Sequence, residues 1–114
     1  MQILTYIADS CVLINGDASS KEELLRLIAS RAAHSGKIDG ISEETLFSAF
    51  KEREKTGSTG FGDGIALPHC TLEGISEFLV GICTIPRGLE FNAIDGNPCS
   101  IFVFIIAPAA RRND

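Results

Sequence analysis

Apolar residues recur every three to four positions in two segments of the first half of the chain, as one face of an α-helix requires. The first segment begins at a capping box formed by Ser20 and Glu23 and ends before Gly36. The second begins at Ser42 and ends near residue 55, where Gly57 follows as a C-terminal stop. We therefore predict two helices, each with one buried face. Their apolar stripes are Leu24, Leu27, Ile28 and Ala32 in the first helix and Leu46, Ala49 and Phe50 in the second.

Short apolar runs between turn residues predict strands at residues 65–67, 78–84 and 100–106, with an earlier strand at residues 11–14. Pro86-Arg87-Gly88 and residues 95–98 predict turns between them. Residues 100–106 are apolar on both faces, which is typical of a central strand that is buried from two sides. Two helices followed by strands predict a layered α/β sandwich.

With 114 residues the chain has the size of a single domain, and its hydrophobic share of 45% is sufficient for a core. A formal net charge of −5 argues against nucleic-acid binding, because phosphate backbones attract basic surfaces. The longest apolar run, residues 101–110, is shorter than the roughly 20 residues that span a bilayer. No secretory signal pattern opens the chain, so we expect a cytoplasmic protein with reduced thiols at its four cysteines. These are Cys11, Cys70, Cys83 and Cys99.

Residues 57–69 carry the strongest chemical signal. Four glycines fall within eight residues, and a short apolar run then leads to His69 directly after Pro68. Glycines let a loop turn with positive φ and let an anion approach the backbone amides. An imidazole can hold or pass a phosphoryl group or a proton near neutral pH. These residues predict a histidine presented beside a phosphate-binding loop; the alternative is a structural histidine at a strand end.

Residues 53–60 (REKTGSTG) and 62–69 (GDGIALPH), together the first motif block, resemble the active-site signature of the enzyme IIA proteins of the bacterial phosphotransferase system. The match is to the fructose, mannitol and nitrogen-regulatory superfamily, and it is closest to the nitrogen-regulatory members. Residues 89–98 (LEFNAIDGNP) are similar to a later segment of the same family, and the apolar strand over residues 101–107 also fits. Two ordered motifs over nearly the whole chain are far more specific than a lone glycine-rich loop.

The resemblance implies a mixed β-sheet sandwiched by helices, with His69 as the phosphorylated residue. It also implies a phosphoryl donor, HPr or its nitrogen-branch counterpart, and an acceptor that is either a IIB unit or a regulatory protein target. The closer motif match favours a nitrogen-regulatory role over a sugar-specific one. This chemistry requires no metal and no other cofactor, and the glycine pattern lacks the signatures of nucleotide-binding loops.

Arg53 is the second catalytic candidate. Helical spacing places it at the edge of the apolar stripe, and its planar guanidinium suits phosphoryl oxygens. The alternative is a cation that favours the helix C-terminus, but the family motif has an arginine at this position. The candidates for binding the phosphoryl group through hydroxyls or backbone amides are Ser58, Thr59, Gly60, Gly62 and Gly64. Turn formation alone is the alternative for each of them.

Three neighbours of these candidates receive structural interpretations. Asp63 is expected to be a turn residue, because a carboxylate beside a phosphohistidine would repel it. Phe61 is expected to tuck into the core, although an exposed partner contact is the alternative. Cys70 departs from the family, in which a small residue is frequent. A Cys–His pair would suggest thiol catalysis or a metal site, but adjacent residues on a strand point to opposite sides. Metal-ligand spacing is also missing, so a metal site would require the fold to gather distant cysteines.

The end of the chain carries a further expectation. A sheet whose last strand is apolar on both faces needs cover on both faces, and the resembled family continues with helices, one of which usually carries a second histidine. We therefore expect residues 1–114 to be a single phosphoryl-carrier domain whose C-terminal helices are missing. Exposed apolar sheet is then expected to drive homo-oligomer formation. A non-catalytic docking module with the same fold is the competing interpretation.

Overall fold

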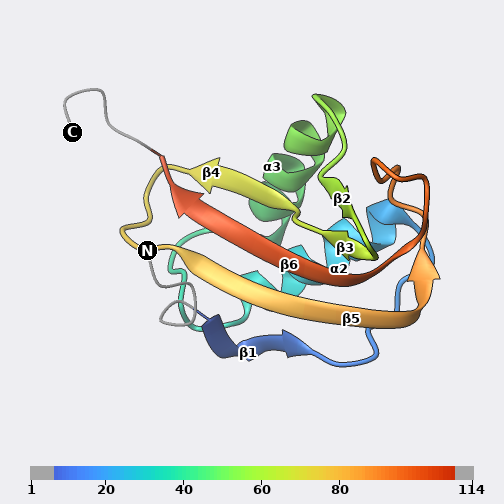
Figure 1. The fold of residues 1–114 in the computed structure, drawn as a ribbon. Coiled ribbons are helices and arrows are strands. Elements are labelled where there is room, and N and C mark those ends of the chain that lie inside the picture. Colours follow the sequence, from blue (N-terminus) through green and yellow to red (C-terminus); the bar gives the residue numbers. More distant parts are fainter. Residues whose placement is uncertain (1–6, 110–114) are drawn as a thin grey trace.

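Both predicted helices form, and each begins at the serine that the sequence marks as its cap. The computed structural model describes residues 7–109, in which two helices lie on one side of a six-stranded mixed sheet (Figure 1). In chain order the elements are β1 (Ile7–Leu13), α2 (Lys21–Ala33), α3 (Glu43–Lys55), β2 (Gly60–Gly62), β3 (Ile65–Ala66), β4 (His69–Leu72), β5 (Leu79–Leu89) and β6 (Cys99–Pro108).

Side-chain caps explain where α2 and α3 begin. Ser20 Oγ accepts a hydrogen bond from the backbone N–H of Glu23 at 3.1 Å, and the Glu23 carboxylate accepts one from Ser19 N–H at 2.7 Å. Ser42 Oγ accepts from Thr45 N–H at 3.1 Å in the same way. These bonds satisfy backbone donors that the first turn of a helix leaves unpaired. The α3 helix ends at Lys55, as expected, with Gly57 at a φ of 149° just beyond it.

The sheet has the order β1-β5-β6-β3-β2, and β4 also pairs with β6. The β6 strand is therefore central: it runs antiparallel to β5 and parallel to β3 and β4. Because Ala66 pairs with Phe102 and His69 pairs with Ile105, β3 and β4 lie one after the other along the same edge of β6. The chain leaves the sheet between them at Leu67 and Pro68, and this interruption positions the candidate histidine.

Several strand bounds differ from the sequence expectation. The predicted strand at residues 65–67 is confirmed as β3, but β2 and β4 on either side of it were not predicted, because strands this short show no periodic pattern. The predicted turn at Pro86-Arg87-Gly88 is wrong, because β5 continues through it to Leu89, with a break in register after Thr84. Proline has no backbone N–H to donate, and an irregular stretch of strand is a place where it is tolerated.

One face of the sheet forms the core with the helices. On β6, Phe102, Phe104 and Ile106 have no exposed surface and face α2 and α3, whereas Ile101 on the opposite face is 42% exposed. Within residues 7–109 no helix covers that opposite face (Figure 1). Neither helix in this described range has the length and apolar character that a membrane crossing requires.

Candidate functional site

His69 lies at the start of β4, directly after the interruption in the sheet edge. The carbonyl of Pro68 accepts a hydrogen bond from Ile105 N–H of β6 at 3.0 Å, which fixes the backbone just before the histidine. Pro68 itself is fully buried, and proline holds φ near one value, so the residue before His69 has little freedom. The imidazole is half-buried and is presented by a rigid backbone.

The two ring nitrogens of His69 have different partners. Nδ1 lies 2.9 Å from the carbonyl oxygen of Leu67, which can only accept, so we assign the proton to Nδ1. Nε2 then carries a lone pair, and it accepts a hydrogen bond from Nε–H of Arg53 at 3.2 Å. A neutral imidazole with its lone pair at Nε2 is the form that acts as a nucleophile.

Arg53 reaches His69 from the last turn of α3, so the structure brings the two candidate catalytic residues together. Its Nη1 group donates to the carbonyl of Gly57 at 2.8 Å and to Thr56 Oγ1 at 3.1 Å. Within residues 7–109 no hydrogen bond is found for Nη2. The guanidinium is therefore held by the glycine-rich loop on one side and faces His69 with its Nε edge, leaving donors that could meet an anion.

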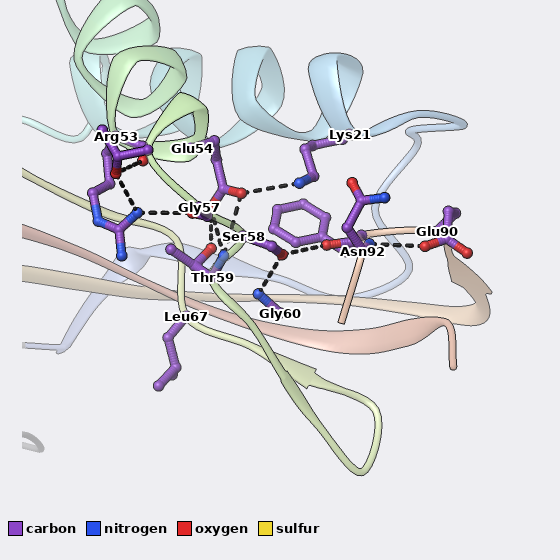
Figure 2. Close-up of polar contacts among 12 residues, drawn as sticks. Lys21, Arg53, Glu54, Gly57, Ser58, Thr59, Gly60, Leu67, Glu90 and Asn92 are labelled. Atoms are coloured by element: carbon purple, nitrogen blue, oxygen red, sulfur yellow. Dashed lines mark hydrogen bonds and ion pairs between the residues drawn. The ribbon is translucent and has the colours of Figure 1, made fainter. Parts of the chain in front are cut away.

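Ser58 and Thr59 direct their hydroxyls into the protein. Ser58 Oγ donates to the carbonyl of Phe91 at 2.6 Å and accepts from Gly60 N–H at 2.9 Å. The hydroxyl of Thr59, a buried residue, donates to the carboxylate of Glu54, as Figure 2 shows. These bonds shape the loop in the present state. That Ser58, Thr59 and the Gly60 amide bind a phosphoryl group stays a prediction.

The glycines of the loop have distinct structural roles. A Cβ on Gly60 would lie 2.8 Å from Cα of Ala93, so glycine is needed where the two loops pass closely. Asp63 and Gly64 form the two-residue turn between β2 and β3 with φ values of 55° and 80°, both positive, as a type I′ turn requires. Asp63 thus has the turn role expected from the sequence. That Gly62 and Gly64 contact phosphate stays a prediction.

Asp95 lies in residues 89–98, the second motif block, and ties that block to the β2–β3 hairpin. Its carboxylate accepts from Asn97 N–H at 3.0 Å and from Asp63 N–H at 2.9 Å, and these bonds lower the pKa of Asp95. Ile94 N–H also donates to the carbonyl of Gly60 at 3.2 Å. Residues 89–98 therefore act as a support for the glycine-rich loop, a role that the motif match did not reveal.

Glu54 is a site residue that sequence reasoning missed. Its side chain is only 6% exposed, and its carboxylate binds Lys21 and Thr59. A signal was present, because Glu54 follows Phe50 by four residues and so continues the buried stripe of α3.

Two expectations about neighbouring residues are tested by burial. Phe61 was expected in the core, and this is wrong: its side chain is 62% exposed, because β2 turns it away from the helices. Cys70 is 5% exposed, and burial raises the pKa of its thiol to about 12, so it stays protonated near neutral pH. In residues 7–109 no group of three or more histidine, cysteine or acidic side chains is arranged to hold a metal ion.

Comparisons with known proteins agree with the motif match. The family model described as phosphoenolpyruvate-dependent sugar phosphotransferase system, EIIA 2, matches residues 5–113. A nitrogen regulatory protein from Pseudomonas aeruginosa is 35% identical over 102 residues, which are 90% of this chain and 65% of that protein. The chain thus spans about two thirds of the length of this curated relative.

Solved structures show the same fold. The crystal structure of the nitrogen regulatory protein IIA-Ntr from Neisseria meningitidis superposes with a TM-score of 0.87 at 24% identity, covering 97% of this chain and 74% of that one. A second match is enzyme IIA in its complex with the phosphorylated mannitol enzyme IIB from Escherichia coli. Its TM-score is 0.71 at 23% identity, covering 88% of this chain and 69% of that one.

Proposed function

Because the chain belongs to the EIIA 2 family of the phosphoenolpyruvate-dependent sugar phosphotransferase system, we propose that it carries a phosphoryl group on His69. The observation that supports this most directly is the contact between Nε2 of His69 and Nε of Arg53 at 3.2 Å. It combines a nucleophilic nitrogen with a cation that can neutralise phosphoryl charge. The bond from Nδ1 to the Leu67 carbonyl keeps the reactive lone pair on Nε2.

The proposed step is a transfer between two imidazoles. The Nε2 lone pair of His69 attacks the phosphorus of a phosphohistidine on the donor, and a new N–P bond forms. The donor N–P bond breaks, and its electron pair returns to the donor ring nitrogen, so that a donor ring with a proton on its other nitrogen leaves as a neutral imidazole. The Nδ1 proton of His69 stays where the Leu67 carbonyl holds it, so no proton has to move within this site.

Arg53 would stabilise the charge of the moving group. In the free state its Nε–H occupies the Nε2 lone pair of His69, so the guanidinium has to shift toward the phosphoryl oxygens as the group enters. Its hydrogen bond to the Gly57 carbonyl keeps it close during that shift. Phosphoryl transfer depends largely on such positioning and charge neutralisation.

The proposed donor is the phosphohistidine of HPr or its nitrogen-branch counterpart. Phe61 and Leu67 are 62% and 36% exposed, and Leu67 lies two residues before His69, so an apolar rim is available for a transient partner.

For the acceptor, the 35% identical relative is a nitrogen regulatory protein, which favours a regulatory protein target. The fold shared with an enzyme IIA bound to phosphorylated IIB keeps a IIB unit as the second candidate. Four free, buried cysteines fit a cytoplasmic location.

The test is phosphoryl transfer from phosphorylated HPr-type carrier, read by intact mass. We expect one acid-labile phosphoryl group on the wild-type chain and none on His69→Ala. The control is His34→Ala, which removes the other histidine of the chain, an exposed residue whose Nδ1 contacts the Ser30 carbonyl. Labelling that survives His69→Ala would refute the assignment. A folded wild-type chain that accepts no phosphoryl group would point to a docking module instead.

The same assay tests Arg53. Arg53→Ala should slow transfer by roughly 100- to 1000-fold, the size of effect seen when one charge-stabilising donor is removed. Lys55→Ala is the matched control, because Lys55 is exposed in the same turn of α3 and pairs only with Glu52 among the described residues. Equal rates for the two variants would exclude a transition-state role for Arg53.

A further inference from the structure

Glu54 places a buried negative charge beside the glycine-rich loop. Its carboxylate accepts from the backbone N–H of Thr59 at 3.2 and 3.3 Å and from the Thr59 hydroxyl. It also forms an ion pair with Nζ of Lys21 at 3.0 Å. Figure 2 shows Glu54 between these two partners. A carboxylate removed from water in this way is stable only when such donors and a counter-charge surround it.

Arg53 and Glu54 hold opposite ends of the same short loop. Arg53 Nη1 donates to the Gly57 carbonyl at 2.8 Å, and Glu54 accepts from Thr59 two residues later. Both side chains leave from the last turn of α3, so the loop over residues 56–59 is clamped to the helix that carries the guanidinium. If Thr59 moves, the Gly57 carbonyl moves with it, and Arg53 loses the partner that orients its Nη1 group.

Lys21 connects this clamp to the rest of the site. It is the first residue of α2, its side chain is 23% exposed, and its Nζ lies 4.5 Å from the ring centroid of Phe91. The carbonyl of Phe91 accepts from Ser58 Oγ at 2.6 Å. The ion pair therefore joins α2, the end of α3, the glycine-rich loop and the second motif block at one buried point.

We propose that Glu54, neutralised by Lys21, is a positioning residue for the reaction. It fixes Thr59, the loop fixes the Gly57 carbonyl, and that carbonyl holds the guanidinium of Arg53 against Nε2 of His69. Its effect on phosphoryl transfer rests on the proposed function. Its effect on the Arg53–His69 contact does not, because this contact exists before any phosphoryl group arrives.

The experiment compares Glu54→Gln with Glu52→Gln in the full 114-residue chain. Both variants remove one carboxylate charge from the same helix, but the Glu52 side chain is 73% exposed and pairs with Lys55. The first readout is nitrogen-15 NMR of the unphosphorylated protein, which follows the Arg53 Nε–H signal and the His69 ring nitrogens. The second is the transfer rate as a function of phosphorylated carrier concentration.

We expect Glu54→Gln to weaken the NMR signal of the Arg53 Nε–H group that is hydrogen-bonded to His69, and to shift the Nε2 resonance of His69. The maximal transfer rate should fall roughly 10- to 100-fold, because small misplacements of catalytic groups lower rates by about this factor. The carrier concentration at half-maximal rate should stay unchanged, because Glu54 is buried away from the partner. Glu52→Gln should match the wild-type chain in both NMR signals and in both kinetic quantities.

A second pair of variants keeps the test decisive if Glu54→Gln folds poorly. Thr59→Val removes the hydroxyl that Glu54 accepts from, whereas Thr59→Ser retains it. We expect Thr59→Val to reproduce the NMR change and Thr59→Ser to restore the wild-type signals.

Lower thermal stability with unchanged Arg53 and His69 signals and unchanged rates would overturn the positioning role. A different outcome separates the two proposals. If Glu54→Gln changes the NMR signals as expected but the wild-type chain accepts no phosphoryl group, the positioning of Arg53 by Glu54 is supported and the proposed function is refuted.

Discussion

At the scale of single residues, the site depends on His69 and Cys70 pointing to opposite sides of β4. The imidazole is half-buried beside Arg53, whereas the adjacent thiol is 5% exposed and packs in the core. Alternation along a strand thus separates a reactive nitrogen from an unreactive sulfur. The thiol chemistry weighed from the Cys–His sequence is disfavoured by this burial.

Burial of the thiols predicts a pH dependence. The pKa values of Cys70 and Cys83 are raised by burial to about 12 and about 11, above the ordinary value of 9.0. Between pH 9 and these values the unfolded chain loses the proton and the native chain retains it. The free energy of unfolding should therefore fall as pH rises, by about 1.4 kcal/mol per pH unit for each thiol in this range.

The measurement is denaturant unfolding at several alkaline pH values. In Cys70→Ala the free energy of unfolding should fall less steeply with rising pH than in the wild-type chain. Alkylation at pH 8 provides the control: the native chain should react slowly and the unfolded chain quickly. Rapid alkylation of Cys70 in the native chain would contradict its burial.

At the scale of elements, the site is a junction between the end of α3, the β2–β3 hairpin and residues 89–98. Ser58 and Asp95 connect the two motif blocks through bonds to Phe91 and Asp63, which are 33 and 32 residues away in sequence. This explains why the two blocks match the family together: the second block supports the loop that the first block forms. The catalytic candidates lie only in the first block.

The close approach of these blocks can be tested at Gly60. Gly60→Ala would place a methyl group 2.8 Å from Cα of Ala93, and backbone cannot move aside easily, so the cost should be about 1–3 kcal/mol of stability. The displaced loop should also slow phosphoryl transfer. Both quantities are measured on the same sample, by denaturant unfolding and by the transfer assay.

Gly74→Ala is the control for Gly60→Ala. Gly74 lies beyond β4 with a φ of 89°, and an added Cβ would meet no heavy atom within 4 Å. This variant should lose only the backbone preference, about 1 kcal/mol, and transfer at the wild-type rate. Transfer that is equally slow in both variants would argue against a specific contact between the two motif blocks.

At the scale of the whole molecule, the sheet has an apolar face without helical cover in residues 7–109. Cross-strand pairs join Val12 to Ile82, Ile82 to Val103 and Thr84 to Ile101, and directly paired residues share a face. Val12 and Ile101 are 36% and 42% exposed. His69 pairs with Ile105 and therefore lies on the same face of the sheet as this apolar surface.

We expect the 114-residue chain to self-associate through this face. Sedimentation velocity should show concentration-dependent association that weakens in the double variant Val12→Thr and Ile101→Thr, because the change lowers the apolar area available for contact. Ile94→Thr is the control, since Ile94 is 84% exposed in the loop over residues 89–98. A chain that stays monomeric at all concentrations and binds no apolar dye would contradict this expectation.

The sequence by itself determined the helices and the identity of the two catalytic candidates. Capping bonds link residues three apart, so Ser20 and Ser42 mark the helix starts without reference to the rest of the chain. The apolar run over residues 100–106 correctly predicted a central position for β6, but the two-sided burial expected from it is not found in residues 7–109, where Ile101 on the face away from the helices is 42% exposed. The motif match identified His69 and Arg53, which the structure brings together.

Only the tertiary structure decided the short strands and the support of the site. The β2 and β4 strands exist because β3 and β6 pair with them, and no local pattern encodes such pairing in two to four residues. The partner of Glu54 is Lys21, 33 residues earlier, and helical spacing cannot indicate which distant side chain will neutralise a buried charge. Local hydrogen bonds and apolar periodicity depend on near neighbours, whereas burial and charge pairing depend on segments that meet only in the folded chain.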